Sequence, residues 1–178
     1  SHDMALRRYS SVMDIIEQID TIPIRKLYPD GAKKIRRSSE IELTLNDSLE
    51  LIKDKGQRPL FKAILDLVFR NDTQAIIIDH KSSAKKVSKF ADQMLFYNIV
   101  VAFALPNLKK IDTYVADLKE GKLKKVSSYT TSAIKKKHFK DFMTKLALLL
   151  APIRDGNYPP RPSKFCKECH IMSCEHKR

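Results

Sequence analysis

The stretch FKAILDLVFRNDTQAIIIDHKSS, residues 61–83, contains the two most apolar strand-like segments of the 178-residue chain. A short polar turn, NDTQ, separates the two segments. Each segment carries one aspartate, Asp66 or Asp79, and Lys81 follows two residues after the second aspartate. Because ionised groups are seldom buried without a compensating partner, these three residues need a specific explanation.

The two apolar segments are expected to form a β-hairpin around the polar turn. The midpoint between Asp66 and Asp79 falls inside that turn, so antiparallel pairing sets them opposite each other on one face. Their Cβ atoms would then be about 5 Å apart. Strand alternation puts Lys81 on the same face and His80 on the other.

Two carboxylates at this distance cannot both ionise comfortably in a low-dielectric environment. A divalent cation with oxygen ligands compensates them directly, and Mg²⁺ or Mn²⁺ suits such a site. Lys81 adds a cation that can orient a water beside the metal, so the group fits phosphodiester hydrolysis. The alternative is structural: a buried Asp–Lys ion pair with a second aspartate at a strand end.

The charge balance points to a polyanionic partner. The chain has 34 Lys and Arg against 21 Asp and Glu, a net charge of +13 and a pI near 9.7. Nucleic acid is the first candidate. The lysine clusters belong to different elements, so one groove could collect them and track the nucleic-acid backbone. The clusters expected to do so are Lys85, Lys86, Lys135, Lys136 and Lys137.

Hydrophobic periodicity and turn residues predict one domain over residues 5–155, followed by a tail rich in proline and cysteine over residues 156–178. The first four residues, SHDM, are interpreted as a cloning scar. The expected helices cover residues 5–20, 87–105 and 131–151, and the last should end near Pro152. The expected strands cover residues 40–45, 60–69, 74–81 and 111–118, with 122–129 as a hairpin partner.

Four separated motifs resemble the PD-(D/E)XK nuclease superfamily, and most closely its RecB-like branch. LDLVF followed by IIIDHKSS resembles the D…(D/E)-x-K signature, and DQMLFYNIVVA resembles the Q-x-x-x-Y helix. The tail resembles the P…C-x-x-C…C segment. The branch includes the nuclease domains of bacterial recombination helicase–nucleases and RecB-like CRISPR-associated nucleases. The resemblance covers residues 38–175 and implies an α/β, restriction-endonuclease-like core, αβββαβ, in which helices flank a mixed sheet.

The resemblance also implies roles for individual residues. Asp66 and Asp79 would bind the catalytic Mg²⁺ or Mn²⁺, and the backbone carbonyl of His80 would add a ligand. Lys81 would assist the attacking water. The metal-binding histidine that this branch usually has on its first helix is missing. Glu17 or Glu40 is the acidic candidate to replace it, and a site with one metal rather than two is compatible with this departure.

Gln93 and Tyr97 correspond to the Q-x-x-x-Y pair and are four residues apart, on one helix face. The resemblance implies that they contact the DNA backbone or support the active site. The alternative is that Tyr97 only packs in the core with the apolar residues of its helix.

The three cysteines of the chain lie in its last thirteen residues, which argues against a disulfide framework. Cys166, Cys169, Cys174 and His176 could hold a structural Zn²⁺, with His170 as the alternative fourth ligand. An iron–sulfur cluster with a non-cysteine ligand, or no metal at all, are the other interpretations. Iron–sulfur relatives use an additional upstream cysteine that this sequence lacks.

The combined expectation is a metal-dependent DNA nuclease, an exonuclease acting on single strands or DNA ends, with a helicase or recombination partner. The alternative is a catalytically inactive nucleic-acid-binding module with the same fold. The longest apolar runs, NIVVAFAL and LALLLAPI, are too short to cross a membrane, and no secretory signal is visible. A cytoplasmic, non-secreted protein is therefore expected.

Overall fold

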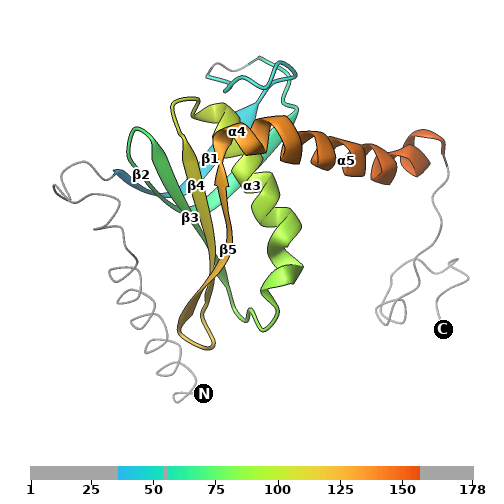
Figure 1. Cartoon of the computed structure of the whole chain (residues 1–178). Helices are drawn as coiled ribbons and strands as arrows, with labels where there is room; N and C mark the ends of the chain where they lie inside the picture. The colour runs from blue at the N-terminus through green and yellow to red at the C-terminus, as the bar shows by residue number, and fades with distance from the viewer. Residues whose placement is uncertain (1–35, 54–55, 157–178) are drawn as a thin grey trace, which may run out of the picture. The chain divides into compact units, whose positions relative to one another are not determined.

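A computed structural model describes residues 36–53 and 56–156 of the chain. Their centre is a five-stranded sheet with the order β1-β2-β3-β4-β5 (Figure 1). Neighbouring strands are antiparallel except β3 and β4, which are parallel, so the predicted mixed sheet is confirmed. The strands are β1 (Arg36–Leu45), β2 (Phe61–Arg70), β3 (Gln74–Lys81), β4 (Lys110–Asp117) and β5 (Lys122–Thr130).

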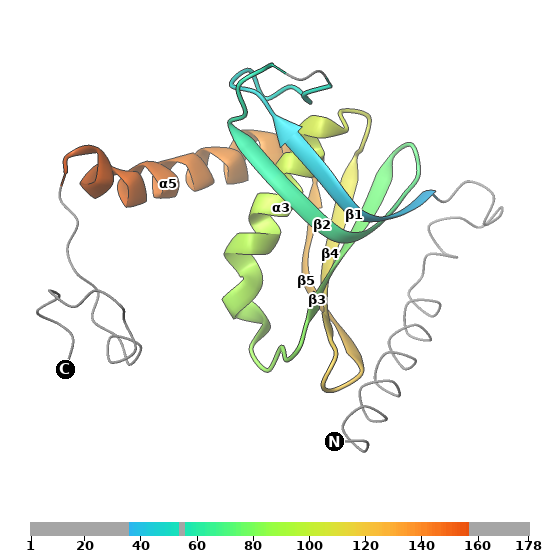
Figure 2. The same ribbon diagram turned by 180° about the vertical axis from the view of Figure 1, so that it is seen from behind.

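A helical crossover joins the parallel strands β3 and β4, as such a pair requires. It begins with a 3-10 turn, η2 (Val87–Phe90), and continues as α3 (Ala91–Ala104). The single α-helix expected over residues 87–105 is therefore wrong at its start, where tighter 3-10 geometry is common. Figures 1 and 2 show α3 along one face of the sheet.

The β2–β3 hairpin has the register that the polar turn predicts. Four pairs connect the strands, from Leu67 with Ile78 to Arg70 with Ala75. In the turn, Asn71 Oδ1 accepts hydrogen bonds from two backbone N–H groups at 2.8 and 2.6 Å. This Asx-type bonding fixes the turn and thereby the register of the strands that follow it.

The alternation of side chains between the two faces of the sheet is broken in β2 near Asp66. Leu65 and Val68 both line a small cavity with residues from the end of α3, although strict alternation would put them on opposite faces. In the paired strand, Glu40 lies opposite Asp66, between the Ser39–Leu67 and Ile41–Leu65 pairs, where the ladder has no pair. Glu40 has a φ of 51°, which is uncommon for a residue other than glycine. Such irregularities bend a strand and re-aim a side chain, here that of Asp66.

The core occupies both faces of the central strands. Five consecutive residues of β3, from Ala75 to Asp79, are buried, as expected for a strand covered on both sides. On one face α3 contributes fully buried side chains, including Met94, Ile99, Val100 and Val101. The other face carries a cluster of Leu67, Phe69, Ile76, Ile78 and Ala116.

Three helical segments follow β5 in place of the single helix expected over residues 131–151. They are α4 (Thr131–Ala133), the π-helical η3 (Ile134–His138) and α5 (Phe139–Arg154). The side chain of Thr130 caps α4 by accepting a hydrogen bond from Ala133 N at 3.2 Å. Pro152 lies inside α5 instead of ending it; in the last turn its missing N–H removes only one helical hydrogen bond.

The chain divides after Phe142 into two compact units, and all five strands and α3 belong to the first. Within this unit the Phe142 ring packs against Phe61 and Phe96, with centroid distances of 6.2 and 5.8 Å. In the second unit, residues 143–154 continue α5.

Several sequence predictions fall outside the described residues. They are the helix over residues 5–20 with Glu17, and the tail metal site of Cys166, Cys169, Cys174 and His176. Among the helices that the structure describes, none has the length and apolar character needed to cross a membrane.

Candidate functional site

Asp79 and Lys81 form an ion pair at the end of β3. Asp79 is 2% exposed and belongs to β3, the central strand of the sheet. Lys81 Nζ lies 2.7 Å from Asp79 Oδ2. Residues two apart on a strand share a face, which explains why the lysine reaches back to this carboxylate. The proximity of the two residues predicted from sequence is confirmed.

The electrostatics of Asp79 favour an additional cation. Burial raises the pKa of Asp79 and the charge of Asp66 adds to the increase, whereas the nearby Lys81 ammonium only partly opposes it. Lys81 Nζ contacts this buried oxygen, Oδ2, and apart from Lys81 no described residue gives it a hydrogen bond. The oxygen therefore keeps a lone pair for a ligand.

Asp66 is anchored to β3 one residue beyond the last β2–β3 pair. Its Oδ2 accepts a hydrogen bond from the backbone N–H of His80 at 2.7 Å. The His80 ring, predicted to point to the other face, nevertheless places Nδ1 3.4 Å from the same oxygen. The Asp66 side chain is 38% exposed, so one carboxylate of the pair is buried and the other is accessible.

The donor set suits a hard divalent cation. Mg²⁺ commonly takes one or two protein carboxylates and completes its octahedral shell with waters and phosphate oxygens. Asp66 and Asp79 supply two carboxylates, and the buried Oδ2 of Asp79 has Lys81 as its one partner among the described residues. Across the described ranges, no three His, Cys, Asp or Glu side chains are placed to hold one metal ion together, so Glu40 does not complete a triad of ligands. The role of the His80 carbonyl stays a prediction.

Helix α3 brings Gln93 and Tyr97 beside the two aspartates. Gln93 Nε2 donates a hydrogen bond to the Tyr97 hydroxyl at 2.8 Å, as their four-residue spacing predicts. Burial raises the pKa of Tyr97, and the charge of Asp79 adds to that increase. Tyr97 is 9% exposed and its ring also packs against Phe96. The core interpretation and the site interpretation of Tyr97 are thus compatible.

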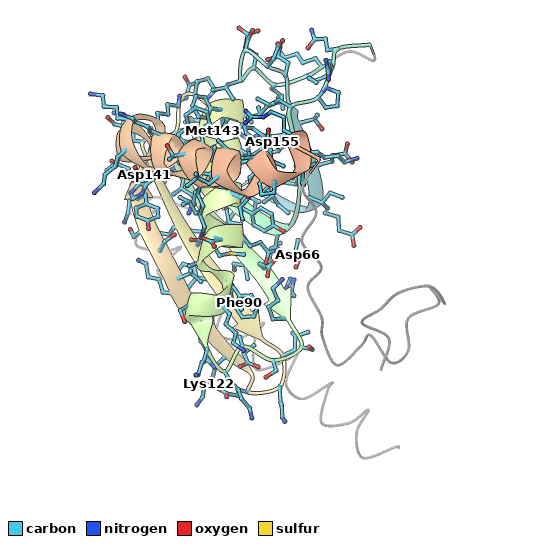
Figure 3. All side chains as sticks on the ribbon, turned by 90° about the vertical axis from the view of Figure 1, so that its right-hand side faces the viewer. Asp66, Phe90, Lys122, Asp141, Met143 and Asp155 are labelled. Carbon is cyan, nitrogen blue, oxygen red and sulfur yellow. The ribbon has the colours of Figure 1, made fainter. Side chains whose placement is uncertain are left out.

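Phe90 closes the other side of the lysine. Lys81 Nζ lies 5.4 Å from the centroid of the Phe90 ring, within the range of a cation–π contact. Figure 3 shows Asp66 and Phe90 near the end of α3 at which the helix begins, with Lys122 at the tip of the β4–β5 hairpin. The Lys81 ammonium therefore contacts both a carboxylate and an aromatic ring, which restricts its movement.

The structure separates the two lysine clusters that were expected to share one groove. Lys85 and Lys86 are exposed in the loop that directly follows Lys81. Lys135–Lys137 lie on η3, shortly after the last residue of β5, Thr130. This end of β5 is the one farther from Lys81, because β5 begins beside the end of β4 that pairs with Lys81. The strands between these ends have eight or nine residues, so the clusters are about 25 Å apart along the sheet.

Sequence reasoning missed a second buried carboxylate next to Lys81. Asp117 ends β4, is 0% exposed, and lies opposite Lys81 in the β3–β4 register. Its Oδ2 is 3.0 Å from Lys124 Nζ. The available signal was an acid at the end of an apolar segment, the same signal that singled out Asp79.

The chain matches the family model of the PD-(D/E)XK nuclease superfamily over residues 25–174. This range includes both aspartates, Lys81 and the whole sheet, which has the restriction-endonuclease-like arrangement that was predicted. The chain therefore belongs to the PD-(D/E)XK nuclease superfamily, a class of enzymes that hydrolyse phosphodiester bonds. A search of curated proteins found no match, and neither did a search of solved structures.

Proposed function

We propose that the protein is a divalent-metal-dependent DNA nuclease of the RecB-like branch, and an exonuclease that acts on single strands or DNA ends. The observation that supports the proposal most is the buried carboxylate of Asp79, ion-paired with Lys81 at 2.7 Å beside Asp66. A buried carboxylate with a raised pKa and an available oxygen is typical of a site that receives a cation.

Asp66 and Asp79 would hold Mg²⁺ or Mn²⁺, with the His80 carbonyl as a further ligand. When bound, such an ion neutralises the scissile phosphate and lowers the pKa of water. The protein contributes orientation: the His80 N–H fixes Asp66 Oδ2, and the central strand β3 fixes Asp79. Fixed ligands do not have to reorganise during the reaction.

Lys81 would orient the attacking water and stabilise charge that develops on the phosphate. Its ammonium has three donors, and the ion pair with Asp79 uses one side of it. Tyr97 accepts its hydrogen bond from Gln93, which leaves the Tyr97 O–H free to donate to a phosphate oxygen or to Asp79. Lys81 and Tyr97 would thus both donate hydrogen bonds to the reacting phosphate.

The charge of the chain supports DNA as the polymer. The net charge is +13, and Lys85 and Lys86 stand exposed directly after Lys81. These two lysines would bind the phosphates nearest the scissile bond, and Lys135–Lys137 would bind a part of the DNA about 25 Å away. Contacts of this kind carry little sequence preference.

The test is a cleavage assay with end-labelled linear DNA and covalently closed circular DNA, each single- and double-stranded. Reactions contain Mn²⁺, Mg²⁺ or EDTA. The proposal predicts cleavage with either metal, none with EDTA, and cleavage of linear but not circular single strands. Cleavage of circular single strands would contradict the exonuclease assignment and leave a metal-dependent endonuclease.

Two lysine variants provide the matched comparison. Lys81→Ala should abolish cleavage while salt-sensitive DNA binding remains. Lys62→Ala removes another strand lysine from a carboxylate pair, the exposed pair with Glu42 at 2.9 Å, and should cleave like the wild type. DNA binding without products under any metal would contradict catalysis and favour the inactive binding module. Equal loss in both variants would exclude a specific role for Lys81.

A further inference from the structure

Asp117 is the most completely hydrogen-bonded carboxylate beside the proposed site. Its Oδ2 accepts hydrogen bonds from Ala84 N at 2.9 Å and from Lys124 Nζ at 3.0 Å. Its Oδ1 accepts from the backbone N–H groups of Lys119 and Glu120 at 3.1 and 3.3 Å. Both oxygens of this fully buried side chain are therefore engaged with two different loops.

The same cluster fixes the turn that follows Lys81. Lys124 Nζ also donates to Ala84 O at 3.1 Å, so both backbone groups of the buried Ala84 are bonded to side chains. One residue after Asp117, Leu118 N donates to Lys81 O at 2.9 Å. A further bond from Lys124 to Glu120 at 2.8 Å ties the β4–β5 turn to the cluster.

We propose that Asp117 and Lys124 are positioning residues for Lys81. They fix, as a clamp, the backbone of the turn from Lys81 to Ala84. The Lys81 ammonium therefore stays in contact with Asp79, and the exposed Lys85 and Lys86 follow a fixed segment of backbone. This inference rests on the proposed nuclease function, because the group that is positioned is the proposed catalytic lysine.

By binding Asp117, Lys124 also prevents that carboxylate from competing with Asp79 for the Lys81 ammonium. Lys81 and Asp117 are direct partners in the parallel β3–β4 register, so their side chains leave the same face of strands about 4.8 Å apart. An Asp117 carboxylate without Lys124 would be a second buried anion within reach of Lys81. With Lys124 bonded to Asp117, Lys81 pairs with Asp79.

The neighbouring residue Lys125 supplies a matched control. It extends to the opposite face of β5 and pairs with Asp112 of β4 at 2.9 Å; Asp112 is also buried, at 6% exposure. Lys125 therefore has the same chemistry, the same two strands and a buried aspartate partner, but no bond to the turn after Lys81. Comparing variants of Lys124 and Lys125 thus separates the effect of losing a Lys–Asp pair from the effect of losing the bonds to the turn after Lys81.

The experiment measures single-turnover cleavage of end-labelled DNA at saturating protein and Mn²⁺, with DNA binding in EDTA and Tm as parallel readouts. Lys124→Gln should lower the cleavage rate at least tenfold while DNA affinity stays within about twofold, as expected for a residue that orients a reacting group. Lys124→Arg, which retains the charge and donors, should recover most of the rate. Lys125→Gln should cleave at the wild-type rate even if its Tm falls as much as that of Lys124→Gln.

A wild-type rate in Lys124→Gln would overturn the inference, as would the same rate loss in Lys125→Gln. If the wild type itself does not cleave DNA, the proposed function fails, and amide hydrogen exchange still tests the clamp. Exchange of the Ala84 amide should accelerate in Lys124→Gln and not in Lys125→Gln. Equal exchange in both variants would contradict the clamp.

Discussion

Asp79 and Asp117 both lie near the ends of two neighbouring parallel strands, and each lies within 3.0 Å of a lysine ammonium. Asp117 accepts regular hydrogen bonds at both oxygens, from two backbone loops and Lys124. Asp79 has Lys81 beside it, and apart from Lys81 no described residue gives its buried Oδ2 a hydrogen bond. Burial alone therefore does not distinguish these two carboxylates, whereas the number of hydrogen bonds that each accepts does.

The pKa values of the two carboxyls shift in opposite directions. Burial raises the pKa of Asp79, and the Lys81 pair does not offset it. Burial also acts to raise the pKa of Asp117, but hydrogen bonds from Lys124, Ala84 and Glu120 outweigh it and lower the value. The fold therefore favours the charged form of Asp117 and disfavours the charged form of Asp79.

The largest expected difference between the two carboxylates is in catalysis. Asp79→Asn should reduce DNA cleavage by about a thousandfold or more, since removing one charge-stabilising group from a preorganised site has effects of this order. Asp117→Asn should reduce it by about ten- to a hundredfold, the range for residues that orient a ligand or reacting group. Single-turnover rates with Mn²⁺ measure both, and an equal loss would erase the distinction.

Stability should respond with opposite signs. Asp117→Asn leaves Lys124 with a neutral partner and should lower the free energy of unfolding by about 3 kcal/mol, as breaking a buried ion pair does. Asp79→Asn removes a charge that the metal-free fold disfavours, so its Tm in EDTA should equal or exceed that of the wild type. Urea unfolding and Tm in EDTA provide the measurements. A lower Tm in Asp79→Asn would assign Asp79 a structural role.

The pH dependence of stability should separate the same two residues. The folded pKa of Asp117 lies below the ordinary value of 3.8, so its stabilisation is present above that value and is lost as pH falls through the folded pKa. The folded pKa of Asp79 lies above 3.8, so its contribution is present below that value and is lost as pH rises through the folded pKa.

The measurement for this prediction is the difference in unfolding free energy between wild type and each Asn variant, from pH 7 to pH 3. The difference should shrink on acidification for Asp117→Asn. For Asp79→Asn, the stability advantage of the variant should be largest at neutral pH and disappear in acid. If this difference in unfolding free energy changed with pH in the same way for both variants, the two carboxyls would have similar environments.

The smallest effect is expected at the edge of the site. Tyr97→Phe removes one hydroxyl, which accepts the Gln93 hydrogen bond, and should lower the cleavage rate about fivefold, as the loss of a single hydrogen bond does. Tyr114→Phe is the control, because Tyr114 lies on the opposite face of the sheet, beside Lys125. Equal rates for the two variants would place Tyr97 in the core alone.

The hairpin and the pairing of Lys81 with Asp79 were predictable because they depend on local sequence. The polar turn between Asp66 and Asp79 sets the register of the two strands, and two-residue periodicity brings Lys81 to Asp79. The spacing of Gln93 and Tyr97 likewise gives their hydrogen bond through helical geometry.

The features that were missed depend on contacts between distant parts of the chain. Asp117 reaches the site only because β4 pairs in parallel with β3 after a long crossover, and no local pattern gives that register. The position of Lys135–Lys137 depends on the direction of β5, which puts them at the far end of the sheet. The left-handed backbone of Glu40 coincides with the missing pair between Glu40 and Asp66 of β2.

The most direct test of the central claim is Mn²⁺ binding, measured by titration of the free ion in the absence of DNA. Wild type and Asp117→Asn should bind Mn²⁺ with similar affinity, and Asp79→Asn should lose at least tenfold, since it removes a carboxylate ligand. Equal binding by Asp79→Asn and wild type would contradict the claim that the incompletely bonded carboxylate of Asp79 is the metal ligand.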